Sequence, residues 1–423
     1  MQNPTQLGIS MKYQLRCLST QELIDDDYTL HHTEGALLHT EYGSELSINI
    51  EKKGLFKFQN WMPHEGVSKN QAGTVTYKST ELQDALGMTD LWITYHGYWP
   101  EKGGMCPTGS FKDMEAVPTL MRLREKGCSG MICASAGNTA RAFSYFCGLE
   151  NFPLIVVVGK EHAKRLYIPA GHPNSSVKLV VIEDGDYYDA KIFAKKISQQ
   201  LDNWQMEGGI HNVARRDGIG SLIVDAAYTI GKLPIHYFQG IGGGPGPVGV
   251  NEMANRLIQS GLFDGPVPRQ HVSQNVEHSP IHNAWQAGRS ALIDSDFPEE
   301  EVEVFSDYLL NKAPAYEVKG GVYDILKESN GQTYVVSKED AVKAKELFES
   351  IEGIDIMTPA AVALASLIQA LESGDIKAND CTVLNISGGG VERMKKDLKT
   401  VAITPWKVVS KNDDVLSVIQ DLL

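Results

Sequence analysis

Thr108-Gly109-Ser110-Phe111-Lys112-Asp113 is the segment that decides how this chain is interpreted. It places one lysine between a glycine turn and a predicted helix start, because the acidic residues after Lys112 favour a first helical turn. A neighbouring aromatic ring and a helix N-terminus both disfavour an ammonium, so we expect Lys112 to lose its proton readily and to react with a carbonyl. For this segment alone, an ordinary surface lysine that opens a helix is the simpler interpretation.

The composition is that of a globular protein with room for two or more structural units. Its 423 residues are 42% hydrophobic and 22% charged, which is ordinary for such proteins. The net charge of −14 argues against a non-specific binder of nucleic acid or anionic membranes. No apolar run approaches the ~20 residues of a membrane-spanning helix, and Met1–Ser10 shows no export signal. The six scattered cysteines suggest neither a metal site nor a disulfide framework, and they favour a reducing cytoplasm.

The pattern of apolar runs predicts an α/β fold with mostly parallel sheets. Short polar and apolar alternations in the first 50 residues predict a small antiparallel ribbon. Further along, continuous apolar runs are typical of strands buried on both faces. These runs are Met131–Ala134, Leu154–Val158, Lys178–Ile182, Ile235–Phe238 and Thr382–Ile386. Helical stretches lie between them, and two of these begin at a Ser337 cap and at Thr358-Pro359.

Ligands of such folds bind at the carboxyl ends of strands, and three more segments follow strands there. Ser135-Ala136-Gly137-Asn138-Thr139 leads into a helix, so its amides suit a carboxylate, although an ordinary turn is an equal alternative. Gly240–Pro247 lets a phosphate approach several amides, and it fits neither a Walker A loop nor a dinucleotide fingerprint. Ser387-Gly388-Gly389-Gly390 presents a hydroxyl after the last strand, where a structural turn is an equally good explanation.

Taken together and in this order, these segments resemble the fold-type II pyridoxal-phosphate enzymes, which share a tryptophan synthase β-like fold. The threonine synthase branch is the most similar, and the resemblance runs from about residue 34 to about residue 395. It implies that Lys112 forms the Schiff base, that Asn138 contacts the ring hydroxyl and that Ser387 faces the pyridine nitrogen. It also implies that the cofactor phosphate binds at Gly242, Gly243, Gly244 and Gly246.

The resemblance implies two α/β domains with parallel-rich sheets behind the N-terminal ribbon. We expect residues 1–50 to form the ribbon, 51–117 with 220–423 the larger cofactor-binding domain, and 118–219 a smaller inserted domain. The cofactor would lie between the domains, and a loop containing Ser135, Gly137 and Thr139 would close over the substrate carboxylate. A homo-oligomer is usual in this family and is therefore expected here.

The departures from threonine synthases concern the substrate. Met114 stands where those enzymes usually carry arginine. The segment that contacts substrate phosphate in that family retains Asn212 and Arg215 but lacks an earlier Asn and Ser. A phosphate contact through Arg215 is therefore expected in an altered pocket.

Three further cations are expected near the anionic substrates, with solvated surface charge as the alternative for each. They are Lys164, Arg165 and Arg216. Lys164 and Arg165 stand at the spacing where threonine synthases keep a lysine.

This combination of matches and departures resembles the cysteate synthases, a threonine synthase-like family of some methanogenic archaea. That family joins O-phospho-L-serine and sulfite to L-cysteate and phosphate, for coenzyme M biosynthesis. The resemblance implies a β-replacement through an aminoacrylate, with pyridoxal 5′-phosphate as cofactor and no metal. A threonine synthase acting on O-phospho-L-homoserine and water stays an alternative. So do a non-catalytic cofactor-binding paralogue and a nucleotide-binding protein that uses residues 240–247.

Overall fold

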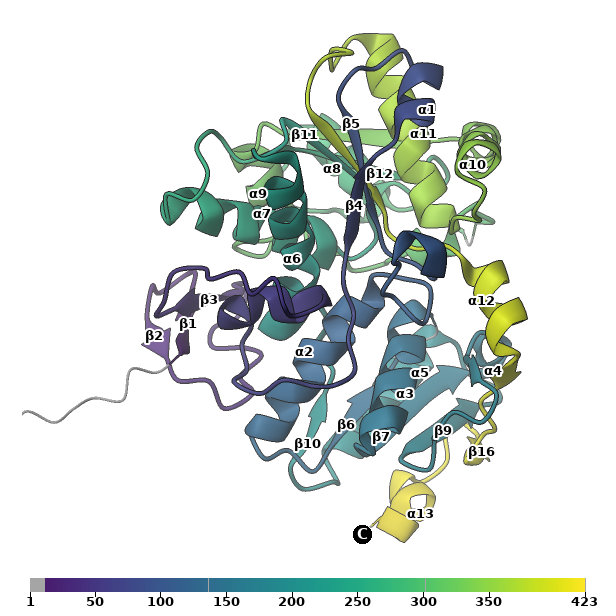
Figure 1. Cartoon of the computed structure of the whole chain (residues 1–423). Helices are drawn as coiled ribbons and strands as arrows, with labels where there is room; N and C mark the ends of the chain where they lie inside the picture. Colours follow the sequence, from purple (N-terminus) through teal and green to yellow (C-terminus); the bar gives the residue numbers. More distant parts are fainter. Residues whose placement is uncertain (1–11, 136, 301, 423) are drawn as a thin grey trace, which may run out of the picture.

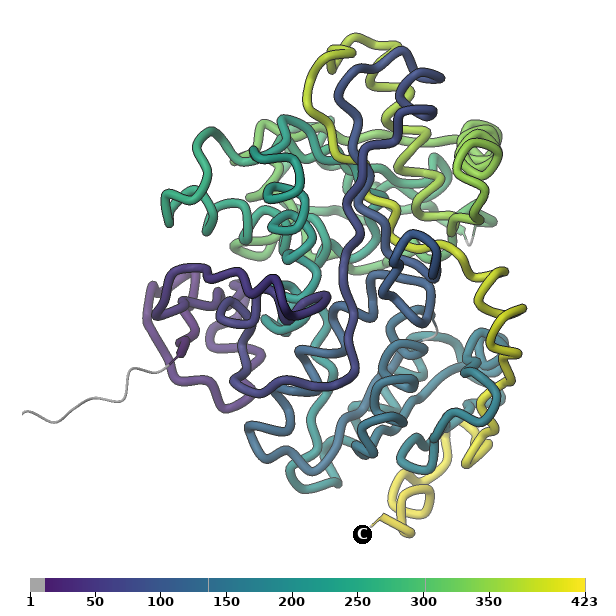
Figure 2. Tube along the Cα trace, in the orientation of Figure 1, coloured from purple at the N-terminus to yellow at the C-terminus, as the bar shows by residue number. Residues whose placement is uncertain are grey.

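The computed structural model describes residues 12–135, 137–300 and 302–422, which contain three larger sheets and one two-stranded sheet. A six-stranded and a five-stranded sheet, both mostly parallel, form two stacked units with helices around them (Figure 1). A three-stranded antiparallel sheet at the N-terminal side lies against the upper unit (Figures 1 and 2). The predicted α/β class with an antiparallel ribbon is therefore confirmed.

The N-terminal ribbon consists of β1 (Tyr13–Cys17), β2 (Leu23–Ile24) and β3 (Leu38–Tyr42). Both neighbours of β1 run antiparallel to it. Leu15, Cys17 and Leu38 are buried together with Val213, which begins a helix of the main body. The alternation seen in the sequence thus places one face of the ribbon on the protein and leaves the other in solvent.

The six-stranded sheet has the order β13-β12-β11-β14-β5-β4. All of its pairs are parallel except β4 with β5. Its strands are β4 (Val75–Lys78), β5 (Leu91–Tyr95), β11 (His236–Gly240), β12 (Arg269–Asn275), β13 (Gln332–Val336) and β14 (Thr382–Ile386). Strand β12 gave no apolar run because it is mostly polar, and its side chains are nevertheless buried.

Helices of the six-stranded unit include two whose starts were predicted. Ser337 accepts a hydrogen bond from the Asp340 amide at 3.1 Å and caps α10 (Lys338–Glu352). Proline opens α11 (Thr358–Ser373), which packs on β11, β12 and β14. The other helices near this sheet are α1 (Thr80–Ala85), α6 (Val213–Ile230), α7 (Pro245–Gln259), α8 (Pro280–Gln286), α9 (Val322–Glu328), and the short turns η1 (Gly54–Trp61), η2 (Pro100–Lys102), η4 (Asp294–Asp296) and η5 (Asp307–Leu309).

The five-stranded sheet is entirely parallel, in the order β10-β6-β7-β9-β16. Its strands are β6 (Gly130–Cys133), β7 (Leu154–Gly159), β9 (Val177–Ile182), β10 (Trp204–Met206) and β16 (Lys407–Val409). The helices around it are α2 (Lys112–Glu125), α3 (Asn138–Glu150), α4 (Lys160–Ala163), α5 (Tyr187–Ser198) and α13 (Val415–Ile419), with the turns η3 (Gly209–His211) and η6 (Gln420–Leu422).

The C-terminal segment corrects one part of the expected domain division. Residues 220–423 were all assigned to the larger unit, but the chain passes through α12 (Val391–Leu398) and β16 joins the smaller sheet (Figures 1 and 2). In addition, β15 (Thr400–Ala402) pairs with β8 (Tyr167–Pro169). The physical reason is that β9 would otherwise be an open edge, and β16 pairs with its backbone while Val409 joins the apolar cluster. The remaining boundaries stay a prediction.

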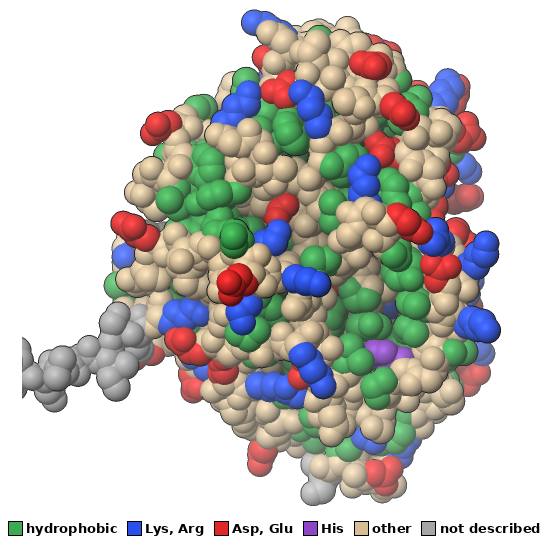
Figure 3. Space-filling model, viewed as in Figure 1, with side chains coloured by type: hydrophobic (Ala, Val, Ile, Leu, Met, Phe, Trp, Pro, Cys, Tyr) green, Lys and Arg blue, Asp and Glu red, His purple; other side chains and the backbone are tan. Residues whose placement is uncertain are grey.

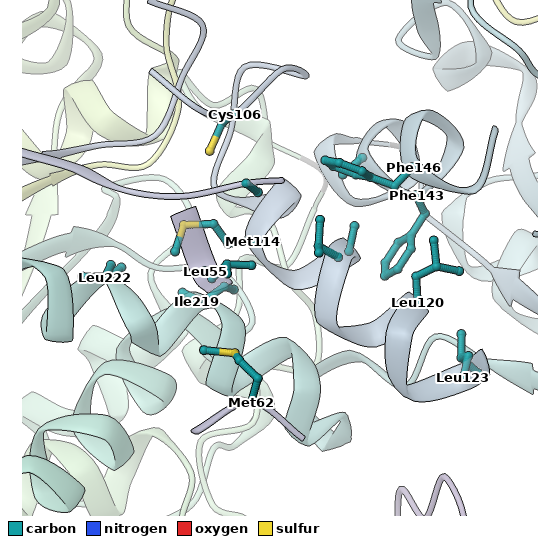
Figure 4. Packing of buried hydrophobic residues seen from close by; sticks show 14 of the residues in the cluster. Leu55, Met62, Cys106, Met114, Leu120, Leu123, Phe143, Phe146, Ile219 and Leu222 are labelled. Carbon is teal, nitrogen blue, oxygen red and sulfur yellow. The ribbon is translucent and has the colours of Figure 1, made fainter. Parts of the chain in front are cut away.

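Helix α2 lies at the centre of the main hydrophobic core (Figure 4). Met114, Leu120 and Leu123 of this helix are buried. They belong to one cluster with the labelled residues Leu55, Met62, Cys106, Phe143, Phe146, Ile219 and Leu222. Gly218 permits the close approach of α6, because a Cβ there would collide with the carbonyl of Met114. The helix that begins with Lys112 is therefore held by both units.

The helices and one face of the surface can be compared with what a membrane-spanning protein would need. None of the helices in the described ranges is long and apolar enough to cross a membrane. The face in Figure 3 carries acidic and basic side chains close to one another, with apolar side chains gathered in patches between them.

Candidate functional site

The lysine loop is joined to the last glycine loop through the backbone. Ser110 pairs with Gly388 in an antiparallel bridge. The Phe111 amide donates to the Ser387 carbonyl at 2.9 Å, and the Gly389 amide donates to the carbonyl of Gly109 at 3.0 Å. Lys112 follows as the first residue of α2, so its predicted place at a helix start is confirmed. The loop therefore lies at the carboxyl end of β14.

Asp113 braces the same loop from inside the protein. Its buried carboxylate accepts from the Thr108 amide at 2.8 Å and also from the Thr108 hydroxyl. Arg141 of α3 donates to the Thr108 carbonyl at 3.1 Å. Burial raises the pKa of Asp113 to about 7, although the hydrogen bonds from Thr108 oppose the shift. The geometry of the lysine loop thus depends on α2 and α3 together.

Lys112 belongs to a buried cluster of alternating charges. Its Nζ lies 3.1 Å from Oε2 of Glu115, and the same oxygen lies 2.8 Å from Nε of Arg215. Arg215 also contacts Glu207 at 2.5 Å and donates to the Thr139 hydroxyl at 3.2 Å. The Lys112 side chain is 15% exposed and that of Glu115 is 0% exposed. The structure therefore brings three predicted site residues, Lys112, Thr139 and Arg215, into one network.

Burial governs the protonation of this cluster. It lowers the pKa of Lys112, and Arg215 lowers it further, whereas Glu115 opposes both effects. For Arg215 burial disfavours the charge, but Glu115 and Glu207 outweigh it and raise the guanidinium pKa. Burial likewise raises the pKa of Glu207 against the influence of Arg215. The lowered lysine pKa agrees with expectation.

The aromatic neighbour of Lys112 does not have the effect expected from sequence. The Phe111 ring centroid lies 4.8 Å from Nζ of Lys112. A cation at that distance is attracted to the ring face, so Phe111 favours the ammonium. The lowering of the lysine pKa is therefore caused by burial and by Arg215 instead.

The glycine loop lies between β11 and α7 and exposes backbone rather than side chains. Gly244 has φ +97° and precedes the first residue of the helix. A Cβ on Gly243 would lie 2.8 Å from the Asn311 amide nitrogen, and a Cβ on Gly246 would collide with Gln239. Within the described ranges, the amides of Gly242, Gly243 and Gly244 donate to no other residue. Free amides at the start of a 15-residue helix fit the phosphate of pyridoxal phosphate.

The Ser135–Thr139 loop faces the last glycine loop through Met357. Asn138 lies with its amide nitrogen 3.5 Å from Sδ of Met357, and its Oδ1 accepts from Arg141 at 2.9 Å. The Met357 amide donates to the Gly388 carbonyl at 2.9 Å. Ser135 accepts a hydrogen bond from the Gly137 amide at 3.4 Å. Ala136 lies outside the described residues.

Asn212 lies at the base of this network as the cap of α6. Its Oδ1 accepts from the Ala214 amide at 3.1 Å and from Arg122 at 3.0 Å. Its amide nitrogen donates to the Thr119 hydroxyl at 2.9 Å and to the Glu207 carbonyl at 3.1 Å. The side chain is fully buried, and a direct contact with substrate stays a prediction.

Arg216 departs from the expectation that it lies near the anions. It pairs with Glu252 at 2.9 Å and donates to the carbonyls of Ile210 and Leu38. Successive helical residues point about 100° apart, so Arg215 and Arg216 reach different partners from adjacent positions of α6.

The two cations that follow β7 have surroundings different from those of Lys112. Lys164 is exposed. Arg165 forms an ion pair with Asp307 and lies 5.9 Å from the ring of Tyr308. Neither joins the Lys112 network, and their contact with substrate stays a prediction.

Tyr308, Glu115 and Glu207 are the site residues that the sequence analysis missed. The Tyr308 ring lies 3.5 Å from the position that a Cβ on Gly137 would take. The backbone carbonyl oxygen of Tyr308 lies 3.3 Å from the position that a Cβ on Gly242 would take. No motif marks Tyr308 or Glu207 in the sequence. Glu115 had a usable signal, because its i,i+3 spacing from Lys112 places both on one helix face.

A separate cavity of ≈ 550 Å³ lies between the ribbon and α7. Its lining includes Tyr42, Trp61, Asn251, Glu252 and Arg256. None of the predicted site residues lines it.

Comparison with known proteins places the chain among characterised sequences. Residues 71–388 match a family model described as pyridoxal-phosphate dependent enzyme. Cysteate synthase of Methanocella arvoryzae is 43% identical over 399 residues, which cover 93% of this chain and 95% of that protein. Cysteate synthase of Methanocorpusculum labreanum is 42% identical over 409 residues, covering 95% and 98%. The structure of maize serine racemase matches with a TM-score of 0.58 at 17% identity, covering 77% of this chain and 92% of that one, a likeness of fold.

Proposed function

The chain belongs to the cysteate synthase family of pyridoxal-phosphate-dependent enzymes, and we propose that it converts O-phospho-L-serine and sulfite to L-cysteate and phosphate. The observation that carries the proposal is the similarity to cysteate synthases along nearly the whole chain. The arrangement of Lys112 between the glycine loop, the Ser387 loop and Arg215 supports it.

Lys112 is the base of the proposed reaction. When bound, the cofactor supplies the electron sink that lets a proton leave Cα of the amino acid. The Lys112 amine takes that proton while the Cβ–O bond breaks and phosphate departs. The sulfur of sulfite then forms a bond to Cβ, and Lys112 returns the proton to Cα. One C–O bond is exchanged for one C–S bond, so no external oxidant or reductant is needed.

Arg215 is the proposed contact for the phosphate of the substrate. It already pairs with Glu115 and Glu207, so an incoming phosphate competes with these carboxylates for the guanidinium. Glu207 is the better candidate for this competition because its side chain is 13% exposed whereas Glu115 is 0% exposed. A charge-assisted hydrogen bond from Arg215 to a phosphate oxygen contributes about 1.5–3 kcal/mol.

The loops around Lys112 supply the proposed binding groups. The amides of Gly242–Gly244 hold the cofactor phosphate, Asn138 contacts the ring hydroxyl and Ser387 faces the ring nitrogen. The Ser135–Thr139 loop closes over the substrate carboxylate, with Tyr308 packed against it. Closure excludes water, which protects the reactive carbon until sulfite arrives.

Phosphate release from the purified, cofactor-loaded protein tests this function. O-phospho-L-serine and O-phospho-L-homoserine are compared, each with and without sulfite. We expect sulfite-dependent release from phosphoserine, with cysteate formed in equal amount. Release from phosphohomoserine without sulfite would instead assign the chain to the threonine synthases.

Two further expectations, a reducing compartment and a homo-oligomer, accompany the proposal. All six cysteines fall in the described ranges as buried free thiols, which supports a reducing compartment such as the cytoplasm. We also expect a homo-oligomer, which light scattering of the cofactor-loaded protein would test.

A further inference from the structure

Glu115 is a carboxylate held inside the protein one helical turn after Lys112. Residues three apart on a helix lie on the same face, which brings its Oε2 to 3.1 Å from Nζ of Lys112. The first turn of α2 favours a negative charge through the helix dipole. A fully buried carboxylate is nevertheless costly unless it is paired, so its presence calls for a partner.

The two oxygens of the Glu115 carboxylate differ in their contacts. Oε2 lies between Lys112 and Arg215, whereas Oε1 is buried with no hydrogen-bond partner among the described residues. Arg215 has a second carboxylate, that of Glu207. In the described part of the chain, Lys112 has Glu115 as its one ion-pair partner. Neutralising Arg215 therefore does not require Glu115, but pairing Lys112 does.

The proposed reaction places a specific demand on Lys112. After taking the Cα proton, its amine must hold that proton as an ammonium while phosphate leaves and sulfite arrives. Burial and the positive charge of Arg215 both favour the neutral amine, and Glu115 opposes them. An ammonium without that counter-ion would release the proton before it is needed again at Cα.

We propose that Glu115 is a second catalytic residue, the counter-ion that keeps the proton on Lys112 between departure of phosphate and addition of sulfite. The inference rests on the proposed function of the site. The proton moves from Cα to Nζ and back to Cα, and Glu115 forms no covalent bond. Its Oε2 accepts the hydrogen bond of the ammonium throughout.

Other ionisable groups surround this pair and define the controls. Arg215 reaches it from α6, Glu207 from the segment after β10, and Cys133 from the end of β6. Asp113 lies on α2 itself and also interacts with Glu115. Glu207 is the matched control because it pairs with Arg215 and makes no contact with Lys112 in the described structure.

The first experiment needs no turnover. In the cofactor-free full-length chain, reaction of Lys112 with added pyridoxal 5′-phosphate is followed by absorbance across a pH series. Only the neutral amine reacts, losing water to form the C=N bond. Glu115→Gln should move the midpoint to lower pH by about 1–3 units, the usual influence of an adjacent opposite charge. Glu207→Gln should move it by less than half as much, and an unmoved midpoint in Glu115→Gln would overturn the proposal.

The second experiment separates a catalytic role from a structural one. For sulfite-dependent phosphate release, Glu115→Gln should lower kcat by about 10²-fold or more, as expected for loss of proton handling. Its KM for phosphoserine should stay within about threefold, because Glu207 rather than Glu115 is the carboxylate that competes with the phosphate for Arg215. A raised KM with an unchanged kcat would mean that Glu115 only positions Arg215, and would overturn the proposal.

A second variant covers the case in which Glu115→Gln does not fold. Glu115→Asp keeps the charge at a longer distance, so its midpoint should lie below that of the wild-type protein by less than the roughly 1–3 units expected for loss of the charge, with partial kcat. A midpoint in Glu115→Asp lowered by the full 1–3 units would contradict a charge effect. If the wild-type protein releases no phosphate from phosphoserine with sulfite, the proposed function fails, and the midpoint experiment still decides whether Glu115 holds the proton on Lys112.

Discussion

Ser110 and Gly388 pair in an antiparallel bridge, although they lie far apart in the sequence. The bridge sets Lys112 beside Ser387, because Phe111 donates from its amide to the Ser387 carbonyl at 2.9 Å. The reactive lysine is thereby held by backbone contacts rather than by its own side chain.

Lys112→Ala should abolish both the visible absorbance of the lysine–cofactor adduct and phosphate release. In the proposed reaction this amine joins the cofactor and takes the Cα proton, and no other lysine contacts Glu115 in the described ranges. Absorbance spectra and phosphate release measure the two effects. Lys338→Ala is the control, because that lysine is 67% exposed on α10 and should leave both unchanged. Unaltered turnover in Lys112→Ala would reject the assignment of the site.

Arg215→Ala should weaken the binding of phosphoserine far more than it weakens the binding of the cofactor. Loss of one charge-assisted contact of about 1.5–3 kcal/mol corresponds to roughly 10- to 100-fold in KM. Steady-state kinetics with phosphoserine and titration of the cofactor-free chain with pyridoxal phosphate give the two numbers. Equal losses in both would place Arg215 at the cofactor instead of the substrate.

Glu207→Gln should improve the affinity for phosphoserine several-fold. Its carboxylate pairs with Arg215 at 2.5 Å and competes with the incoming phosphate for the guanidinium. The measurement is KM for phosphoserine at constant sulfite, and the exposed Glu299→Gln is the control. A higher KM in Glu207→Gln would show that Glu207 orients Arg215 and does not compete with substrate.

Arg216→Met should destabilise the fold without a specific effect on substrate binding. It leaves the buried Glu252 without its main cation, and breaking such a pair from one side costs about 3–5 kcal/mol. Thermal unfolding at neutral pH measures the loss. The double variant with Glu252→Gln should be less destabilised than the sum of the single variants, since no buried charge is then left unpaired.

The stabilisation from the Arg216–Glu252 ion pair should be lost in acid over a defined pH range. Burial acts to raise the pKa of Glu252, but Arg216 and His39 lower it from 4.5 to about 2. Because the folded-state pKa is depressed, this stability is present above pH 4.5 and is lost as the pH falls toward about 2. Glu252→Gln should flatten the unfolding curve in that range.

The wild-type protein should lose stability as the pH rises, and Asp113→Asn should not show this loss. Burial raises the pKa of Asp113 from 3.8 to about 7. A raised pKa means that the stabilising contribution is complete below pH 3.8 and is lost as the pH rises through about 7. The Tm of the wild-type protein should therefore fall more between pH 5 and pH 8 than the Tm of Asp113→Asn. Parallel curves for both proteins would contradict a buried, titrating Asp113.

Local patterns in the sequence were sufficient to predict the strands and helix starts that depend on neighbouring residues. The run Thr382–Ile386 is strand β14 to the residue, and the Ser337 cap begins α10. Lys112 opens its helix as expected. In each case the signal is a short-range one, a hydrophobic run or a capping side chain, and its partner lies within a few residues.

Partners distant in the chain were outside the reach of these patterns. Strand β12 was missed because its buried residues are polar and paired across the sheet. Strand β16 was assigned to the wrong unit because a three-residue strand does not reveal which open edge it covers. The roles of Phe111 and Arg216 were misjudged because a residue type does not disclose the direction of its side chain.

The sequence by itself determined the α/β class, and it supplied the order of the proposed ligand-binding loops and the lysine proposed to carry the chemistry, because these depend on local composition and on motifs read in order. Only the tertiary structure decided that Glu115 lies between Lys112 and Arg215, that Glu207 occupies the arginine and that Ser110 meets Gly388. Those contacts depend on sheet topology and on the angle between helices α2 and α6, which bring together residues that no local pattern relates.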